Sequence, residues 1–202
     1  MSIRIAAVPL LSVVAVLSAC ASAPVVDGTV VPTEGPHDDL TARAFVLDDG
    51  DGAELCLGAV GQSLPPACGG PTITGWDWDD VEGEESQSGS TWGDYDVVGT
   101  WDGLSFALTR TPVFSDPFAE STVTPRPEPT PGDPANADAV ARAVEDYSNA
   151  MGTATGLLGL GEHRGRAWVI VIHDDGTLQA EADAEYGDDV VVIESRLRPA
   201  VG

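Results

Sequence analysis

The chain has 202 residues, with 33 acidic and 9 basic side chains, and its formal net charge at pH 7 is -24. Every basic residue is an arginine, and lysine is absent. A surface this acidic repels nucleic acid and anionic lipid, so we expect no nucleic-acid binding and no electrostatic attachment to a membrane. The length allows one ordinary domain or two small ones.

The first twenty residues predict a short secretory leader that ends at a cysteine. Arg4 supplies a positive start, and an apolar run from Ile5 to Leu17 follows it. A helix needs about 20 apolar residues to cross a bilayer, so we interpret this shorter run as a cleaved leader. The closing residues Leu17-Ser-Ala-Cys20 resemble the lipobox of bacterial lipoproteins.

This resemblance implies that residues 1–19 are removed and that Cys20 carries a diacylglycerol thioether. Two acyl chains make a stable anchor, so the resemblance places the protein on the extracytoplasmic face of the cell membrane, with the membrane as its partner through Cys20 alone. The alternative is an ordinary secretory peptide cut at another small residue, for instance after Ala23. Residues 20–41 are rich in proline and glycine and predict a flexible tether.

Residues 42–111 predict a first domain built from short β-strands. Gly, Pro and Asp clusters separate five apolar-bearing runs, which are Arg43–Leu47, Ala53–Gly58, Thr72–Trp78, Asp94–Trp101 and Leu104–Thr111. The last two flank Asp102-Gly103, a dipeptide favoured in tight hairpin turns because both central residues need positive φ. We therefore predict a small antiparallel β barrel or sandwich, with an OB-like barrel as one option, because strand count alone does not choose the topology.

Two cysteines remain in this domain once Cys20 is assigned to lipid. Cys56 and Cys68 form an even pair about a dozen residues apart, which in an oxidising compartment predicts a disulfide. A metal or redox site is the less favoured interpretation, because the chain has no Cys-x-x-Cys and no histidine close to the pair. We predict no metal site and no cofactor.

Residues 112–134 are rich in proline and predict an extended, semi-rigid linker, with a long loop inside one domain as the alternative. The second domain, residues 135–202, begins with a helix that Asp133 caps and Pro134 opens. One face of this helix carries the apolar residues Val140, Val144, Tyr147 and Met151.

Two continuous apolar runs, Ala167–Ile172 and Val190–Ile193, are typical of buried strands. Thr177–Tyr186 lies between them and fits either a strand or a helix; its Ala, Glu and Gln content and the following Gly187 favour the helix. The second domain is thus a small α/β domain of order α-β-α-β, and the fold class of the whole chain is α+β.

Five segments resemble parts of uncharacterised actinobacterial secreted proteins and lipoproteins. These segments are Glu54–Gly58, Ser63–Pro71, Gly75–Trp78, Tyr95–Thr109 and Leu197–Pro199. The resemblance covers much of the chain after the leader. It implies an envelope protein with a Cys56–Cys68 disulfide, and it brings no activity with it.

Trp76 and Trp78 are the candidate binding face. They are two residues apart, so on a strand they would share a face, and aromatic faces stack on sugar rings such as those of wall glycan. Trp92 and Trp101 are candidates to lie nearby. The alternative is that these tryptophans supply the core of a domain with few other aromatic residues, and we favour it.

Enzyme signatures are weak, so we name no catalytic residue. The acidic stretches Asp48–Asp51 and Asp77–Glu85 lack the spacing of a calcium loop, and we interpret them as solvated turns. His173-Asp174-Asp175 is an acid/base candidate at a strand end, but a turn leaving a buried strand explains it more simply.

These observations predict a lipid-anchored cell-envelope protein with a binding or structural role. Its expected partners are wall polymer, another exported protein or a small solute. The alternatives are a cell-wall hydrolase with a carboxylate or His173 site, and an accessory or inhibitory module for a secreted enzyme.

Overall fold

The computed structural model describes residues 39–116, 129–152 and 156–200. The described residues all belong to one compact unit, Pro36–Gly202. The predicted leader, the lipidation site Cys20 and nearly all of the predicted tether lie outside the described residues, as does much of the predicted linker, residues 117–128.

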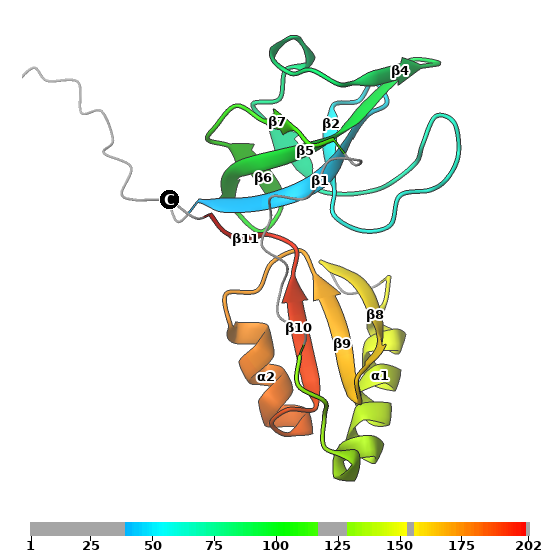
Figure 1. Ribbon diagram of the computed structural model, residues 1–202, viewed down its shortest axis with the longest axis vertical. Helices are drawn as coiled ribbons and strands as arrows, with labels where there is room; N and C mark the ends of the chain where they lie inside the picture. The colour runs from blue at the N-terminus through cyan, green and yellow to red at the C-terminus, as the bar shows by residue number, and fades with distance from the viewer. Residues whose placement is uncertain (1–38, 117–128, 153–155, 201–202) are drawn as a thin grey trace, which may run out of the picture. The chain divides into compact units, whose positions relative to one another are not determined.

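Five strands close into a small barrel (Figure 1), namely β1 (Leu40–Asp48), β2 (Ala53–Cys56), β3 (Thr72–Thr74), β5 (Ser90–Trp101) and β6 (Ser105–Leu108). They follow the order β1-β2-β3-β6-β5, and β5 pairs back with β1 along the whole of β1. The β3–β6 pair is parallel and the other barrel pairs are antiparallel. The predicted barrel is therefore confirmed, and its strand order fits the OB-like option rather than a sandwich.

Three very short strands extend the barrel sheet. β4 (Glu85–Gln87) and β7 (Val113–Phe114) pair with β5, and β11 (Arg198–Pro199) pairs with β1. Strands of two or three residues carry no readable alternation, which is why the sequence did not predict them. The predicted run Thr72–Trp78 is a strand only as far as Thr74, and a 3-10 turn, η1 (Trp78–Asp80), follows it.

Alternating side chains fill the barrel. Along β1, every second residue from Leu40 to Val46 is buried, as the period of a strand with one inward face requires. The other barrel strands bury Leu55, Ile73, Tyr95, Val97 and Phe106 in the same cluster. Leu197, which is 0% exposed, joins this cluster from the far end of the chain.

Cys56 and Cys68 form the predicted disulfide, with their Cα atoms 5.9 Å apart. Cys56 is buried and packs in a small cluster with Leu47 and Trp92. An isolated bridge between Gly61 and Ala67 orders the loop that the disulfide closes.

The second sheet has three strands, and two helices pack against it. It contains β8 (Leu157–His163), β9 (Arg166–Val171) and β10 (Val191–Ser195), together with α1 (Ala137–Ala150) and α2 (Thr177–Tyr186). β9 and β10 are parallel and joined through α2, so the predicted helix and β-α-β unit are confirmed. A 3-10 turn, η2 (Pro134–Asn136), precedes α1, and the Asp133 side chain caps it.

The predicted order α-β-α-β lacks one strand. β8 pairs antiparallel with β9, so the observed order is α-β-β-α-β. Gly159 and Gly161 interrupt the apolar pattern of β8, and the sequence therefore resembles a connecting loop.

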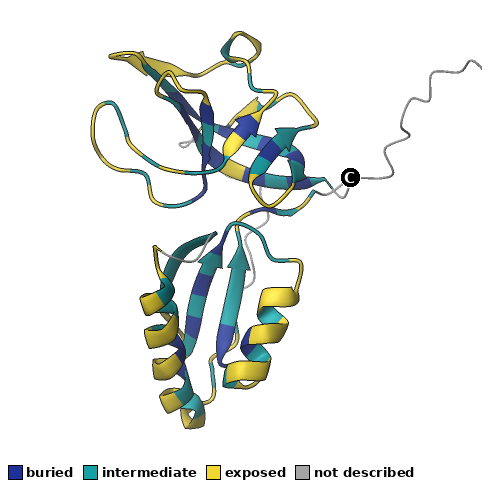
Figure 2. Cartoon of the chain, turned by 180° about the vertical axis from the view of Figure 1, so that it is seen from behind, coloured by how far each residue is buried: buried dark blue, intermediate teal, exposed yellow. Residues whose placement is uncertain are grey.

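Both helices pack on one face of this sheet. Ala167, Val169 and Val171 of β9 are buried in one cluster with side chains of both helices. Figure 2 shows the outer faces of α1 and α2 as exposed. Met151 does not belong to the buried face as predicted, because it follows the last turn of α1 and is 39% exposed.

The hairpin between β5 and β6 forms at the predicted Asp102-Gly103. Only Gly103 has a positive φ, 96°, so the turn is not the two-residue type that the dipeptide suggested. The Asp102 side chain instead accepts hydrogen bonds from the backbone N–H groups of Leu104 (2.8 Å) and Ser105 (2.7 Å). These bonds fix a wider turn that leaves Leu104 at its tip.

Candidate functional site

The predicted binding residues Trp76 and Trp78 pack against the barrel core. Their ring centroids are 5.1 Å apart, and the Trp76 ring lies 4.9 Å from that of Tyr95 in an edge-to-face arrangement. Both side chains are half-buried. These contacts favour the core interpretation, while a sugar-stacking role for the pair stays a prediction.

The acidic stretches form turns. Asp48 accepts hydrogen bonds from the backbone N–H groups of Gly50 (2.9 Å) and Gly52 (3.2 Å), and the Gly50 bond contributes most to holding the pKa of Asp48 below its ordinary value. Asp77 caps η1 through the N–H of Asp79. Within the described ranges, no group of three His, Cys, Asp or Glu residues is placed to hold a metal ion.

His173-Asp174-Asp175 forms the loop from β9 into α2. Asp174 accepts hydrogen bonds from the N–H groups of Gly176 (3.0 Å) and Leu178 (2.9 Å). Hydrogen bonds from Thr177, first from its side chain and then from its backbone, hold the pKa of Asp175 below its ordinary value. A general acid needs a raised pKa, so these contacts favour a helix-starting turn over an acid/base pair.

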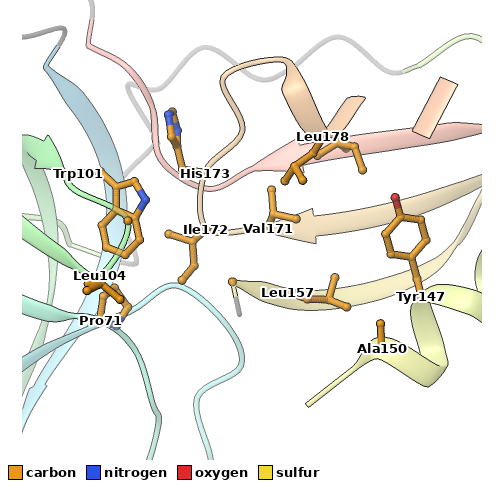
Figure 3. Close-up of a pocket in the computed structure, with 13 residues that line it drawn as sticks. Pro71, Trp101, Leu104, Tyr147, Ala150, Leu157, Val171, Ile172, His173 and Leu178 are labelled. Atoms are coloured by element: carbon orange, nitrogen blue, oxygen red, sulfur yellow. The ribbon is translucent and has the colours of Figure 1, made fainter. Parts of the chain in front are cut away.

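A mostly apolar cavity of about 390 Å³ lies beside this loop (Figure 3). Ligand pockets in proteins span roughly 300 to 1,000 Å³, so the cavity is large enough for a small molecule. Its walls are formed by Pro71, Trp101, Gly103, Leu104, Tyr147, Ala150, Gly156, Leu157, Val171, Ile172, His173, Leu178 and Ile193.

The cavity sits at the carboxyl end of strand β9. Val171 ends this strand, and Ile172 and His173 follow it into the loop. Leu157 at the start of β8 and Leu178 in the first turn of α2 add further walls. Sheets covered by helices commonly bind ligands at the carboxyl ends of their parallel strands, where the chain leaves a crevice.

Two leucines at this cavity are exposed to solvent. Leu104, at the tip of the β5–β6 hairpin, is 79% exposed, and Leu178 is 39% exposed. Both belong to the cavity wall, beside the half-buried ring of Trp101 at the end of β5. Exposed apolar side chains that gather around a hollow mark a binding site more often than scattered ones do.

Tyr147, His173 and the indole N–H of Trp101 supply the polar side-chain groups of the cavity wall. Burial raises the pKa of Tyr147 above its ordinary value, and the carboxylates of Glu181 and Asp174 add to the effect. The Tyr147 hydroxyl is therefore protonated at neutral pH and can donate a hydrogen bond. His173 places Nδ1 3.4 Å from the carbonyl oxygen of Leu197.

A second, more polar recess of about 840 Å³ adjoins the cavity and shares Trp101 and His173 with it. Asp39 lies in its wall and forms an ion pair with Arg110, with an Nη2–Oδ2 distance of 3.2 Å. The recess is lined by Asp39, Leu40, Thr100, Trp101, Arg110, His173, Asp174, Asp175, Pro199 and Ala200.

In comparisons with known proteins, no family model, no curated protein and no solved structure matches this chain. The resemblances to bacterial lipoproteins and to actinobacterial secreted proteins therefore stay predictions. Across residues 39–116, 129–152 and 156–200, no helix is long and apolar enough to span a membrane.

The sequence indicated His173 as a candidate and Trp101 only as a neighbour of Trp76 and Trp78. It did not predict the cavity that His173 and Trp101 both line. Leu104, Leu157 and Leu178 belong to three separate elements, and nothing in their spacing indicates that they meet. The one available signal is Leu104, because a large apolar residue directly after an Asp-Gly turn has no core position to fill.

Proposed function

We propose that this protein is a lipid-anchored component of the cell envelope that binds a small apolar ligand in the cavity beside Trp101. The carrying observation is the cavity itself, which has an apolar wall and an exposed leucine rim at Leu104 and Leu178. The anchoring half of the proposal depends on the lipobox resemblance at Cys20.

Binding is a better-supported function than hydrolysis. Among the described residues, the cavity wall contains no carboxylate, and Asp174 and Asp175 in the loop beside it accept hydrogen bonds that start α2. The lowered pKa of Asp175 keeps it ionised, which is unsuited to protonating a leaving group. A concave, mostly apolar surface with a few hydrogen-bonding groups, such as those of Tyr147 and His173, is instead typical of a small-molecule site.

Binding of the neutral fluorophore N-phenyl-1-naphthylamine tests this function. The full chain carrying Cys20→Ala, which has no acylation site, should bind the probe saturably with an increase in its fluorescence. A probe of about 17 non-hydrogen atoms at about 0.3 kcal/mol per atom gives a Kd of roughly 0.2 mM.

Ala150→Phe supplies the decisive variant. Ala150 ends α1 and lines the cavity, so a phenyl group there should fill the space and weaken probe binding at least tenfold. Ala141→Phe makes the same change at an exposed position of the same helix, outside the cavity wall, and should leave binding unchanged. No saturable binding, or equal binding by both variants and their parent, would contradict the proposed function.

A further inference from the structure

The apolar cavity continues into the polar recess through two shared residues. Trp101 and His173 line both spaces, so a ligand seated against Leu157 and Leu178 can extend past them into the recess. The recess has a larger volume, about 840 Å³ against about 390 Å³, and a different chemistry. The two together match a molecule with an apolar part and a polar head.

The charge of the recess selects the sign of that head. Three carboxylates, Asp39, Asp174 and Asp175, line it against one arginine, Arg110. Arg110 is already paired with Asp39, which leaves the two carboxylates at the start of α2 without a compensating arginine among the recess residues. A chain with a net charge of -24 further disfavours the approach of an anionic head.

Trp101 adds an attraction that is specific for cations. Its indole lies in the wall between the two spaces, near Leu104 on one side and His173 on the other (Figure 3). The face of an indole attracts an ammonium group through the ring quadrupole, and tryptophan gives the strongest contact of this kind. A quaternary ammonium is a preferred partner of such a ring because it is weakly hydrated.

We propose that the cavity and the recess form one site for a cationic amphiphile. Its apolar chain lies in the cavity among Leu104, Leu157 and Leu178, and its ammonium head lies in the recess between Trp101 and the carboxylates of Asp174 and Asp175. This inference rests on the proposed function, since it takes the apolar cavity as the binding site and adds the identity of the head group.

Three decyl compounds of similar size test the head group. Decyltrimethylammonium is a cation, N,N-dimethyldecylamine N-oxide is neutral overall, and decanoate is an anion. Each is titrated, below its micelle-forming concentration, against N-phenyl-1-naphthylamine bound to the full chain carrying Cys20→Ala, and its displacement of the fluorophore is measured. We expect the cation to bind about tenfold more tightly than the amine oxide and decanoate to bind most weakly.

Asp175→Asn tests the contribution of the recess. Asparagine keeps the side-chain oxygen that accepts the Thr177 N–H bond, so α2 keeps its start while one negative charge is lost. The variant should weaken decyltrimethylammonium about fivefold. Asp51→Asn removes the same charge from an exposed turn outside the recess and should leave the binding of decyltrimethylammonium and of N-phenyl-1-naphthylamine unchanged.

The possible results separate the two proposals. If the fluorophore binds and Ala150→Phe blocks it, but the three decyl compounds compete equally, the cationic head is refuted and the apolar site stands. Equal weakening by Asp175→Asn and Asp51→Asn would also refute the recess as the head-group site. If the fluorophore does not bind saturably, the proposed function fails, and the head-group inference fails with it.

Discussion

Replacing Tyr95 by phenylalanine should make the protein more stable at neutral pH. Tyr95 is 0% exposed inside the barrel, and its hydroxyl oxygen has no hydrogen-bond partner in the described part of the chain. Its ring is held independently by edge contacts with Trp76, Trp78 and Phe114, at centroid distances of 4.9 to 6.2 Å. Removing the oxygen therefore removes an unsatisfied polar atom and keeps the packing.

The expected gain follows from the cost of that atom. A buried hydroxyl without a hydrogen bond costs about 1–3 kcal/mol, part of which the new phenylalanine loses through imperfect contact at the vacated site. We expect Tyr95→Phe to raise the free energy of unfolding at pH 7 by about 1 kcal/mol. Tyr186→Phe is the matched control, because the Tyr186 hydroxyl donates to Asp146 at 3.1 Å and its loss should bring no gain.

Tyr95→Phe should also change the free energy of unfolding at alkaline pH. Burial, followed by the carboxylates of Glu84 and Asp94, raises the pKa of Tyr95 from 10.0 to about 12. Because the folded pKa lies above the unfolded one, ionisation of Tyr95 costs no stability below about pH 10 and lowers the free energy of unfolding as the pH rises from about 10 to 12. A shift of two pKa units corresponds to a loss of roughly 2–3 kcal/mol in the free energy of unfolding across this pH range. Tyr95→Phe should remove this loss.

Urea unfolding followed by tryptophan fluorescence, at pH 7 and at steps between pH 9 and 11.5, measures both effects. The chain has no lysine, so tyrosine is the principal side chain that titrates in this interval, and absorbance at 295 nm follows it directly. A loss of more than about 1 kcal/mol at pH 7 would refute the reasoning, because it would mean that the Tyr95 hydroxyl is hydrogen-bonded.

Three further changes have defined outcomes. The double variant Cys56→Ala/Cys68→Ala should lower the free energy of unfolding by about 3 kcal/mol, the chain-entropy value for a separation of 12 residues, and an unchanged urea midpoint would contradict the disulfide's role. Cys20→Ala should abolish incorporation of radiolabelled palmitate in a bacterial host, whereas persistent labelling would exclude the lipobox assignment. Leu197→Ala should lower the free energy of unfolding by about 2–5 kcal/mol in the same assay. Leu64→Ala, at a 67% exposed position, should lower it by less than about 0.5 kcal/mol. Similar losses for the two variants would argue against Leu197 as a core residue.

The fold was largely predictable because most of its elements have a complete local signal. The barrel strands carry alternating or continuous apolar residues between turn formers, and α2 occupies Thr177–Tyr186 as its composition predicts. β8 was missed because its glycines erase the alternation of a strand. The parallel pairing of β3 with β6 joins residues more than thirty positions apart, from Thr72 to Ser105, and no local pattern reports it.

The candidate site was far less predictable. His173 and Trp101 were each visible as residues of interest, but the cavity also needs Tyr147 and Leu178, which come from other elements. Their meeting is a property of the tertiary structure. Trp76 and Trp78, the tryptophans predicted as a candidate binding face, instead pack against each other and around the buried ring of Tyr95.

The packing of Leu197 and β11 against the barrel has a consequence for biogenesis. β11 pairs with β1 through Leu40↔Pro199 and Thr41↔Arg198, and Leu197 fills the barrel core. Synthesis delivers Leu40 well before Leu197, so this part of the barrel core stays unfilled until residue 197 has left the ribosome or, if the protein is exported, the translocation channel. Contacts of such long sequence separation form slowly. A protease that removes the segment containing Leu197 and β11 would therefore expose the barrel core.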